Sequence, residues 1–128
     1  MGIIKHYNLK QTDIFIFDHY VINQIHDGAI IKPPDEKELN KIIQKHFSGK
    51  DMVYISNRMN SYTVDPLIYP KVEDIPNLVA IALVPKTKTM RNNAEYEKNF
   101  YDKPFKVFYT LMAAVLWTDK VLRTEEKK

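Results

Sequence analysis

The run from Leu78 to Val84 (LVAIALV) constrains the fold of this chain most, because every position in it is apolar. A strand that buries one face alternates apolar and polar residues, whereas a strand that is covered on both faces is apolar throughout. Both faces are covered in the parallel part of an α/β sheet, where helices pack on each side. The run therefore predicts a central parallel strand.

Strand-like and helical patterns follow one another along the chain in a definite order. Three short β-rich runs within residues 3–25 are joined by short spacers, which is typical of an antiparallel meander. Later the strand patterns at 52–55, 78–84 and 105–108 alternate with helical ones. The apolar spacing predicts packed helices over 35–48, 88–101 and 110–124. We therefore predict an α/β fold with a mixed β-sheet, antiparallel in the N-terminal meander and parallel in the C-terminal part.

Two of these patterns carry local signals of their own. Asp35, with Glu38 three residues later, is expected to cap the first helix in the manner of a capping box. The proline-punctuated stretch 57–77 leaves room for one short helix near 66–72.

Length and composition favour one globular domain spanning 1–128, with 124–128 expected to fray as a tail. Hydrophobic residues make up 45% of the chain and charged residues 27%, which is an ordinary globular balance. The chain has no cysteine, no recognisable signal peptide and no apolar run of the roughly 18 residues that a membrane span needs. These features suit a cytoplasmic protein without a membrane span.

Charge and motifs exclude several classes of function. Nineteen basic residues against 16 acidic ones give a net charge of +3, and the two signs are mixed along most of the chain, so we expect no nucleic acid partner. The four histidines form no H-E-x-x-H or similar ligand pair, so no metal site is expected. The chain also lacks a G-x-S-x-G segment and a glycine-rich phosphate loop. We expect no cofactor and no catalytic residue, and an enzyme with an unrecognised carboxylate or serine centre ranks last.

Three segments resemble the small SpoIIAA-like proteins of the STAS type, which are similar to anti-sigma-factor antagonists. They are the end of the meander (VINQIHDG), the strand and loop VYISNRMNSYTVDP, and the terminal pair PFKVF and TLMAAVLWTDKVL. The resemblance implies a sheet of four to six strands with packed helices, in a regulatory or binding module that is usually not an enzyme. Some members are switched by phosphorylation of a serine after a central strand. Here that segment reads Ile55-Ser56-Asn57-Arg58 and lacks the family's pattern.

Two polar segments are candidate ligand sites. The stretch 56–66 follows a buried strand, and ligands of open α/β sheets bind beyond the carboxyl ends of strands. In it, Arg58 is a candidate anion clamp, and its other candidate ligand-binding residues are Asn60, Ser61 and Thr63. At the start of the helix at 88–101, backbone N–H groups together with basic side chains can hold an anion; these side chains are Lys86, Lys88 and Arg91. The alternative for the first segment is an ordered loop whose side chains hydrogen-bond to its own backbone. The alternative for the second is a helix start that is exposed to solvent and binds no ligand.

The helix at 110–124 carries more apolar surface than its core face requires. A helical wheel places the core stripe on one side, and Met112 and Leu116 on the other, with Trp117 at the border. These three residues are a candidate interface, with self-association as its simplest form. Alternatively, a neighbouring loop covers them, or their exposure has no function.

Two functions stay open at this point. The first is a non-catalytic regulatory or protein-interaction module of STAS-like type, forming a homodimer or binding a regulatory protein partner. The second is a protein that binds a small molecule or an anionic lipid in a pocket near 56–66 and 86–91.

Overall fold

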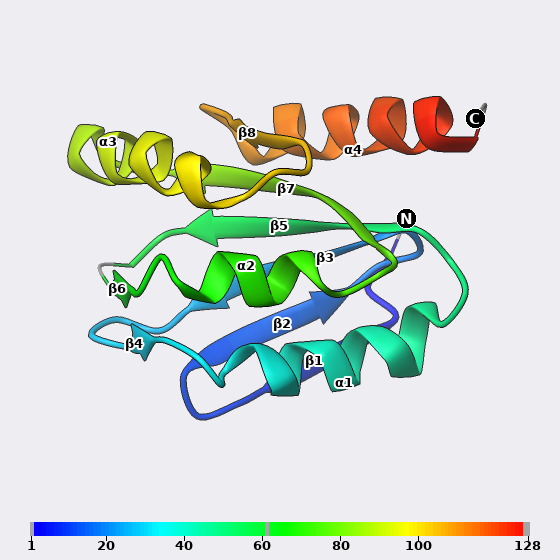
Figure 1. Cartoon of the computed structure of the whole chain (residues 1–128), viewed down its shortest axis with the longest axis horizontal. Coiled ribbons are helices and arrows are strands. Elements are labelled where there is room, and N and C mark those ends of the chain that lie inside the picture. Colours follow the sequence, from blue (N-terminus) through cyan, green and yellow to red (C-terminus); the bar gives the residue numbers. More distant parts are fainter. Residues whose placement is uncertain (1, 61, 127–128) are drawn as a thin grey trace.

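The structure is a computed structural model that describes residues 2–60 and 62–126 (Figure 1). Its main element is a mixed six-stranded sheet. Across the sheet the strands are β1 (Lys5–Asn8), β2 (Thr12–Ile16), β3 (Tyr20–Ile25), β5 (Met52–Arg58), β7 (Leu78–Pro85) and β8 (Phe105–Val107).

The direction of the strands changes within the sheet as the sequence predicts. The strands β1, β2 and β3 pair antiparallel, whereas β3, β5, β7 and β8 pair parallel. The apolar run at 78–84 forms β7, which lies between β5 and β8 and is buried at every position except Val79, which is half-buried. The α/β class and the mixed sheet are therefore confirmed.

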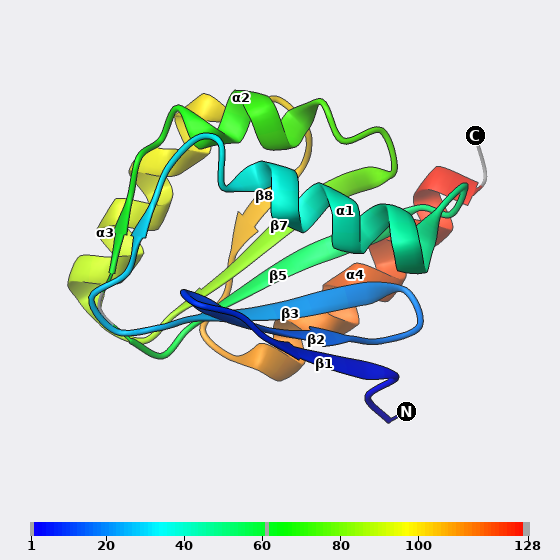
Figure 2. The same ribbon diagram turned by 90° about the horizontal axis from the view of Figure 1, so that it is seen from below.

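Helices cover both faces of this sheet (Figure 2). The helices are α1 (Glu36–Phe47), α2 (Ile68–Glu73), α3 (Lys88–Glu97) and α4 (Leu111–Glu126), and a 3₁₀ turn (Lys98–Phe100) extends α3. On one face, α1 and α2 pack side by side, and the core beneath them includes Ile43 and Phe47 of α1, Val72 of α2 and Ala94 of α3. On the other face, α4 packs over Val53 and Ile55 of β5.

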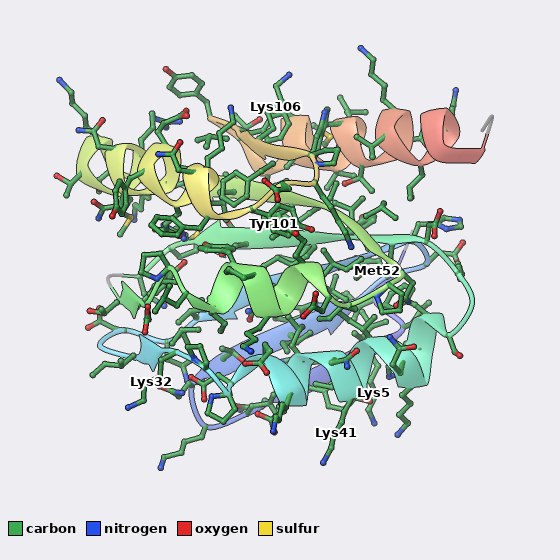
Figure 3. The ribbon with its side chains drawn as sticks, viewed as in Figure 1. Lys5, Lys32, Lys41, Met52, Tyr101 and Lys106 are labelled. Atoms are coloured by element: carbon green, nitrogen blue, oxygen red, sulfur yellow. The ribbon has the colours of Figure 1, made fainter. Side chains whose placement is uncertain are left out.

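Alternation along the strands separates the two cores. In β5, Val53 and Ile55 face α4, while Met52 and Tyr54 belong to the opposite core, because successive side chains of a strand point to opposite faces. Met52 and Tyr101 lie inside the molecule in Figure 3, where the labelled lysines extend from its surface.

A second, two-stranded sheet was not expected from the sequence. Strand β4 (Ile30–Ile31) pairs parallel with β6 (Thr63–Val64). Figure 1 shows both short strands near the N-terminal end of α1.

Several predicted boundaries need correction. The loop expected from residue 56 starts later, because β5 pairs with β7 as far as Arg58 opposite Pro85. Asp35 does not cap α1 with its side chain; its carboxylate instead accepts a hydrogen bond from the backbone N–H of Lys32 at 2.8 Å. Residues 124–126 of the expected frayed tail belong to α4, and 127–128 lie outside the described residues.

Candidate functional site

A cavity of about 380 Å³ is lined by residues of the main sheet, of α1 and α2, and of the small β4–β6 sheet. Its walls are mainly apolar, and the sheet contributes polar side chains to one part of them. The apolar side chains lining it include Ile14, Ile25, Ile31, Leu39, Val72 and Leu83.

The strand β5 supplies the polar part of the cavity wall. Tyr54, Ser56 and Arg58 are two residues apart, so they project from the same face of the strand toward the cavity. Asn23 of β3 lies opposite Ser56 in the parallel register. These residues therefore share one face of the sheet, and Ile31 of β4 and Val64 of β6 line the same cavity.

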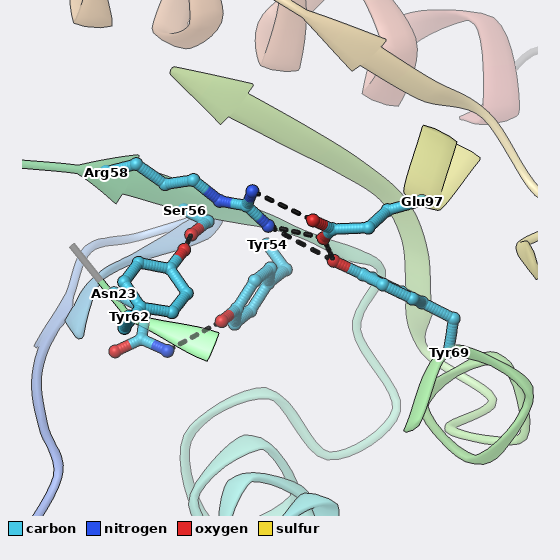
Figure 4. Close-up of polar contacts among 7 residues, drawn as sticks. All are labelled: Asn23, Tyr54, Ser56, Arg58, Tyr62, Tyr69 and Glu97. Atoms are coloured by element: carbon cyan, nitrogen blue, oxygen red, sulfur yellow. Dashed lines mark hydrogen bonds and ion pairs between the residues drawn. The ribbon is translucent and has the colours of Figure 1, made fainter. Parts of the chain in front are cut away.

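Arg58 is held in a buried ion pair rather than offered to solvent (Figure 4). Its Nη1 donates to Oε2 of Glu97 at 3.0 Å and its Nη2 to Oε1 at 2.5 Å, while the Tyr69 hydroxyl also donates to Oε1. Burial lowers the pKa of Arg58, but the hydrogen bonds to Glu97 together with the electrostatic attraction of Tyr62, Tyr69 and Glu97 outweigh it and keep the pKa above its ordinary value. The charge of this arginine is therefore neutralised within the protein.

Three tyrosines surround the ion pair as neutral hydrogen-bonding groups. The hydroxyl of Tyr54 accepts from Nδ2 of Asn23 at 2.6 Å, and the hydroxyls of Tyr62 and Ser56 are 3.3 Å apart. Burial raises the pKa of Tyr54, Tyr62 and Tyr69 above the ordinary value of 10.0. All three phenols therefore keep their protons near neutral pH.

Polar atoms of three side chains lining the cavity have no hydrogen-bond partner among residues 2–60 and 62–126. They are Nε of Arg58, Oδ1 of Asn23 and Oε1 of Glu36. Arg58 and Asn23 are each only 5% exposed. A buried polar atom without a partner costs about 1–3 kcal/mol, so these atoms favour a guest that hydrogen-bonds to them.

The predicted ligand-binding residues of the first segment lie in different places. Arg58 lines the cavity from the end of β5. It is already paired with Glu97, whereas the sequence predicts an arginine that clamps an anionic ligand. Asn60 is exposed and donates to the carbonyl of Ile25 at 3.2 Å, and Thr63 is an exposed residue of β6. Ser61 lies outside the described residues.

The predicted basic residues near the start of α3 do not converge on this cavity. Lys86 and Lys88 are exposed, while Arg91 donates to the carbonyls of Pro85 and Phe108 and stacks on Tyr109. A second hollow, of about 680 Å³, does lie between the segment after β5 and the start of α3. Its described lining includes Asn60, Thr63, Thr87 and Thr89, but none of the three basic side chains.

The candidate interface residues on α4 separate into two kinds. Met112 and Leu116 are 67% and 65% exposed, as the helical wheel predicts. Trp117 is half-buried and packs against Phe108, with ring centroids 5.4 Å apart. The exposed strip therefore consists of Met112 and Leu116, and Trp117 belongs mainly to the core of that face.

Sequence reasoning missed Asn23, Tyr54, Tyr69 and Glu97 as site residues. One pattern could have located Tyr54: it is two and four residues before Ser56 and Arg58, so a strand that continues through Arg58 places all three on one face. Glu97 gave no signal, because an acidic residue in a helix ordinarily faces solvent.

In the described ranges, no group of three or more His, Asp or Glu side chains has the geometry of a metal site. Over the same residues, no helix is long and apolar enough to cross a bilayer.

Comparison with known proteins assigns the fold. No protein-family model matches the sequence, and no curated protein is significantly similar to it. A similar solved structure is that of an uncharacterised protein of the DUF3478 family from Shewanella loihica PV-4, described as having a SpoIIAA-like fold. The alignment covers 88% of this chain and 97% of that one, with a TM-score of 0.59 and 13% sequence identity.

The fold is SpoIIAA-like. This confirms the resemblance drawn from the strand and helix segments of the sequence. At 13% identity the likeness concerns the fold, and the chemistry of a SpoIIAA-like protein has to be argued from its own side chains.

Proposed function

We propose that this protein is a small-molecule-binding module that holds its ligand in the cavity between the sheet and the helices α1 and α2. The observation that carries the proposal is that two buried polar atoms of side chains lining the cavity, Nε of Arg58 and Oδ1 of Asn23, have no hydrogen-bond partner among the described residues. The cavity volume of about 380 Å³ lies within the roughly 300–1,000 Å³ that is usual for ligand pockets. A mainly apolar wall with a few placed polar groups is also the usual composition of such sites.

The same side chains favour binding over catalysis. A general base acts best when its pKa lies near the working pH. Burial moves the pKa of the cavity tyrosines away from neutrality, and Arg58 is held as a permanent cation by Glu97. These groups orient a ligand through hydrogen bonds but do not readily exchange protons with it.

Binding of the neutral fluorophore aminoanthracene tests this function without knowledge of the natural ligand. Ile31 lines the cavity, and the variant Ile31→Phe fills part of it. Ile30 is its neighbour on β4 but is 57% exposed and does not line the cavity, so Ile30→Phe is the matched control.

We expect saturable binding to the wild type and to Ile30→Phe, and at least about tenfold weaker binding to a folded Ile31→Phe, a difference of about 1.4 kcal/mol. Absence of binding to the wild type contradicts the proposal whatever the variants do. Equal affinity of Ile31→Phe, with a normal circular dichroism spectrum, contradicts it as well.

A regulatory protein-interaction module of STAS type is the second candidate. It is supported by the SpoIIAA-like fold and by the exposed strip of Met112 and Leu116 on α4. Apolar side chains that are this exposed on a helix suit a contact with a protein partner or with a second copy of the chain. The strip and the cavity lie on opposite faces of the sheet, so the two proposals are tested independently.

A further inference from the structure

The charges around the cavity restrict the chemistry of its ligand. Of the described charged side chains that line it, Lys10 and Arg58 are basic, while Asp35, Glu36 and Glu38 are acidic. Arg58 is paired with both carboxylate oxygens of Glu97, and Lys10 is an exposed residue of the turn between β1 and β2. An anion in the cavity would therefore lose its hydration without gaining an unpaired buried cation.

The unpartnered atoms indicate the functional group of the ligand. Arg58 offers an N–H donor at Nε, and Asn23 offers an acceptor at Oδ1, because its Nδ2 already donates to Tyr54. Both side chains line the cavity, Asn23 from β3 and Arg58 from the end of β5. A hydroxyl or a carboxamide can accept from Nε of Arg58 or donate to Oδ1 of Asn23, so an uncharged polar group suits either atom.

The apolar part of the cavity wall does not require a hydrogen-bonding group on the ligand. Ile14, Ile25 and Leu83 from the sheet face Leu39 of α1 and Val72 of α2 across the cavity. Apolar surface of this kind stabilises an apolar guest by about 25 cal/mol for each Å² removed from water.

We propose that the ligand is an uncharged amphiphile, with an apolar body and one hydroxyl or carboxamide head that accepts a hydrogen bond from Nε of Arg58. This inference rests on the proposed function and names the class of ligand for the same cavity. It differs from the anionic ligand considered from the sequence, because Glu97 neutralises the arginine that would have attracted an anion.

The test is a titration of the ¹⁵N-labelled wild-type chain, followed by NMR, with octanamide, octanol and octanoate. These molecules share a hydrocarbon chain and differ at the head group. The side-chain Nε–H resonance of Arg58 is the direct readout, because this group gains a hydrogen bond only if the head reaches it. Ile31→Phe again serves as the variant with a partly filled cavity, and Ile30→Phe as its control.

We expect octanamide and octanol to shift the Arg58 Nε–H resonance and to bind at least about tenfold more tightly than octanoate. Octanoate binding as tightly as the neutral molecules, or more tightly, overturns the assignment of an uncharged ligand while leaving the proposed function in place. If none of the three shifts the resonances of the cavity residues, the proposed function fails as well.

Discussion

Arg58 at the end of β5 and Glu97 in α3 form a buried bidentate ion pair, with N–O distances of 3.0 and 2.5 Å. The side chains are 5% and 7% exposed, so water screens the pair little. The pair joins the sheet to α3 beside the cavity, and Nε of Arg58 has no hydrogen-bond partner among the described residues.

Breaking this pair is expected to destabilise the fold strongly. Arg58→Met leaves the Glu97 carboxylate buried without its cation, and loss of one partner of a buried pair costs about 3–5 kcal/mol. Glu97→Leu leaves the arginine unpaired in the same way. Urea unfolding of both variants measures the loss.

The double variant Arg58→Met with Glu97→Leu provides the control for this interpretation. Removing both charges is expected to cost clearly less than the sum of the two single losses, because no uncompensated charge remains. Strictly additive losses would contradict the buried pair.

The strip on α4 predicts how association depends on a single residue. Leu116 is 65% exposed, so Leu116→Lys is expected to leave the free energy of unfolding within about 0.5 kcal/mol of the wild type. The same change is expected to make any dimer monomeric, as measured by light scattering.

Tyr96→Lys is a suitable control, because it adds a charge at a 59% exposed aromatic residue of α3, away from the strip. A dimer that survives Leu116→Lys with normal circular dichroism would argue against the α4 interface.

The carboxylate of Asp13 predicts a pH dependence of stability. Nε2 of His6 and Nε2 of His26 lie 2.8 and 2.9 Å from its two oxygens, and these hydrogen bonds lower the pKa of Asp13 below its ordinary value of 3.8. A carboxyl with a depressed pKa stabilises the fold above its unfolded pKa, and this stabilisation is lost as the pH falls through the folded pKa.

Asp13→Asn is therefore expected to lower the free energy of unfolding by about 0.5–1 kcal/mol near neutral pH, since the site is partly exposed. The difference from the wild type should disappear at pH values well below 3.8. Chemical denaturation at several pH values measures this, and a difference that persists unchanged in strong acid would contradict it.

The sequence predicts the framework of this protein well, because the framework depends on local periodicity. The unbroken apolar run of β7 indicates a covered strand, and the wheel of α4 places Ala114, Thr118 and Leu122 on the buried side, where they lie. The hydroxyl oxygens of Thr87 and Thr110 accept hydrogen bonds from the backbone N–H groups of Met90 and Ala113 at the starts of α3 and α4, a local interaction typical of helix caps.

The site is less predictable because it depends on contacts between distant segments. Arg58 and Glu97 are 39 residues apart, and neither position shows that the other is its partner. Strands β4 and β6 have two residues each, which is too short for a periodic signal. The sequence also predicts the basic residues near the start of α3 to be anion ligands. In the structure, Arg91 instead donates hydrogen bonds to the carbonyls of Pro85 and Phe108 and stacks on Tyr109.

Native mass spectrometry of the purified wild-type chain, compared with Ile31→Phe, is the decisive experiment for the ligand cavity. We expect the wild type to carry a discrete extra mass that denaturation releases, the released compound to be uncharged, and Ile31→Phe to lack it. Wild-type protein that shows no extra mass and also fails to take up added octanamide or octanol would rule out the ligand cavity.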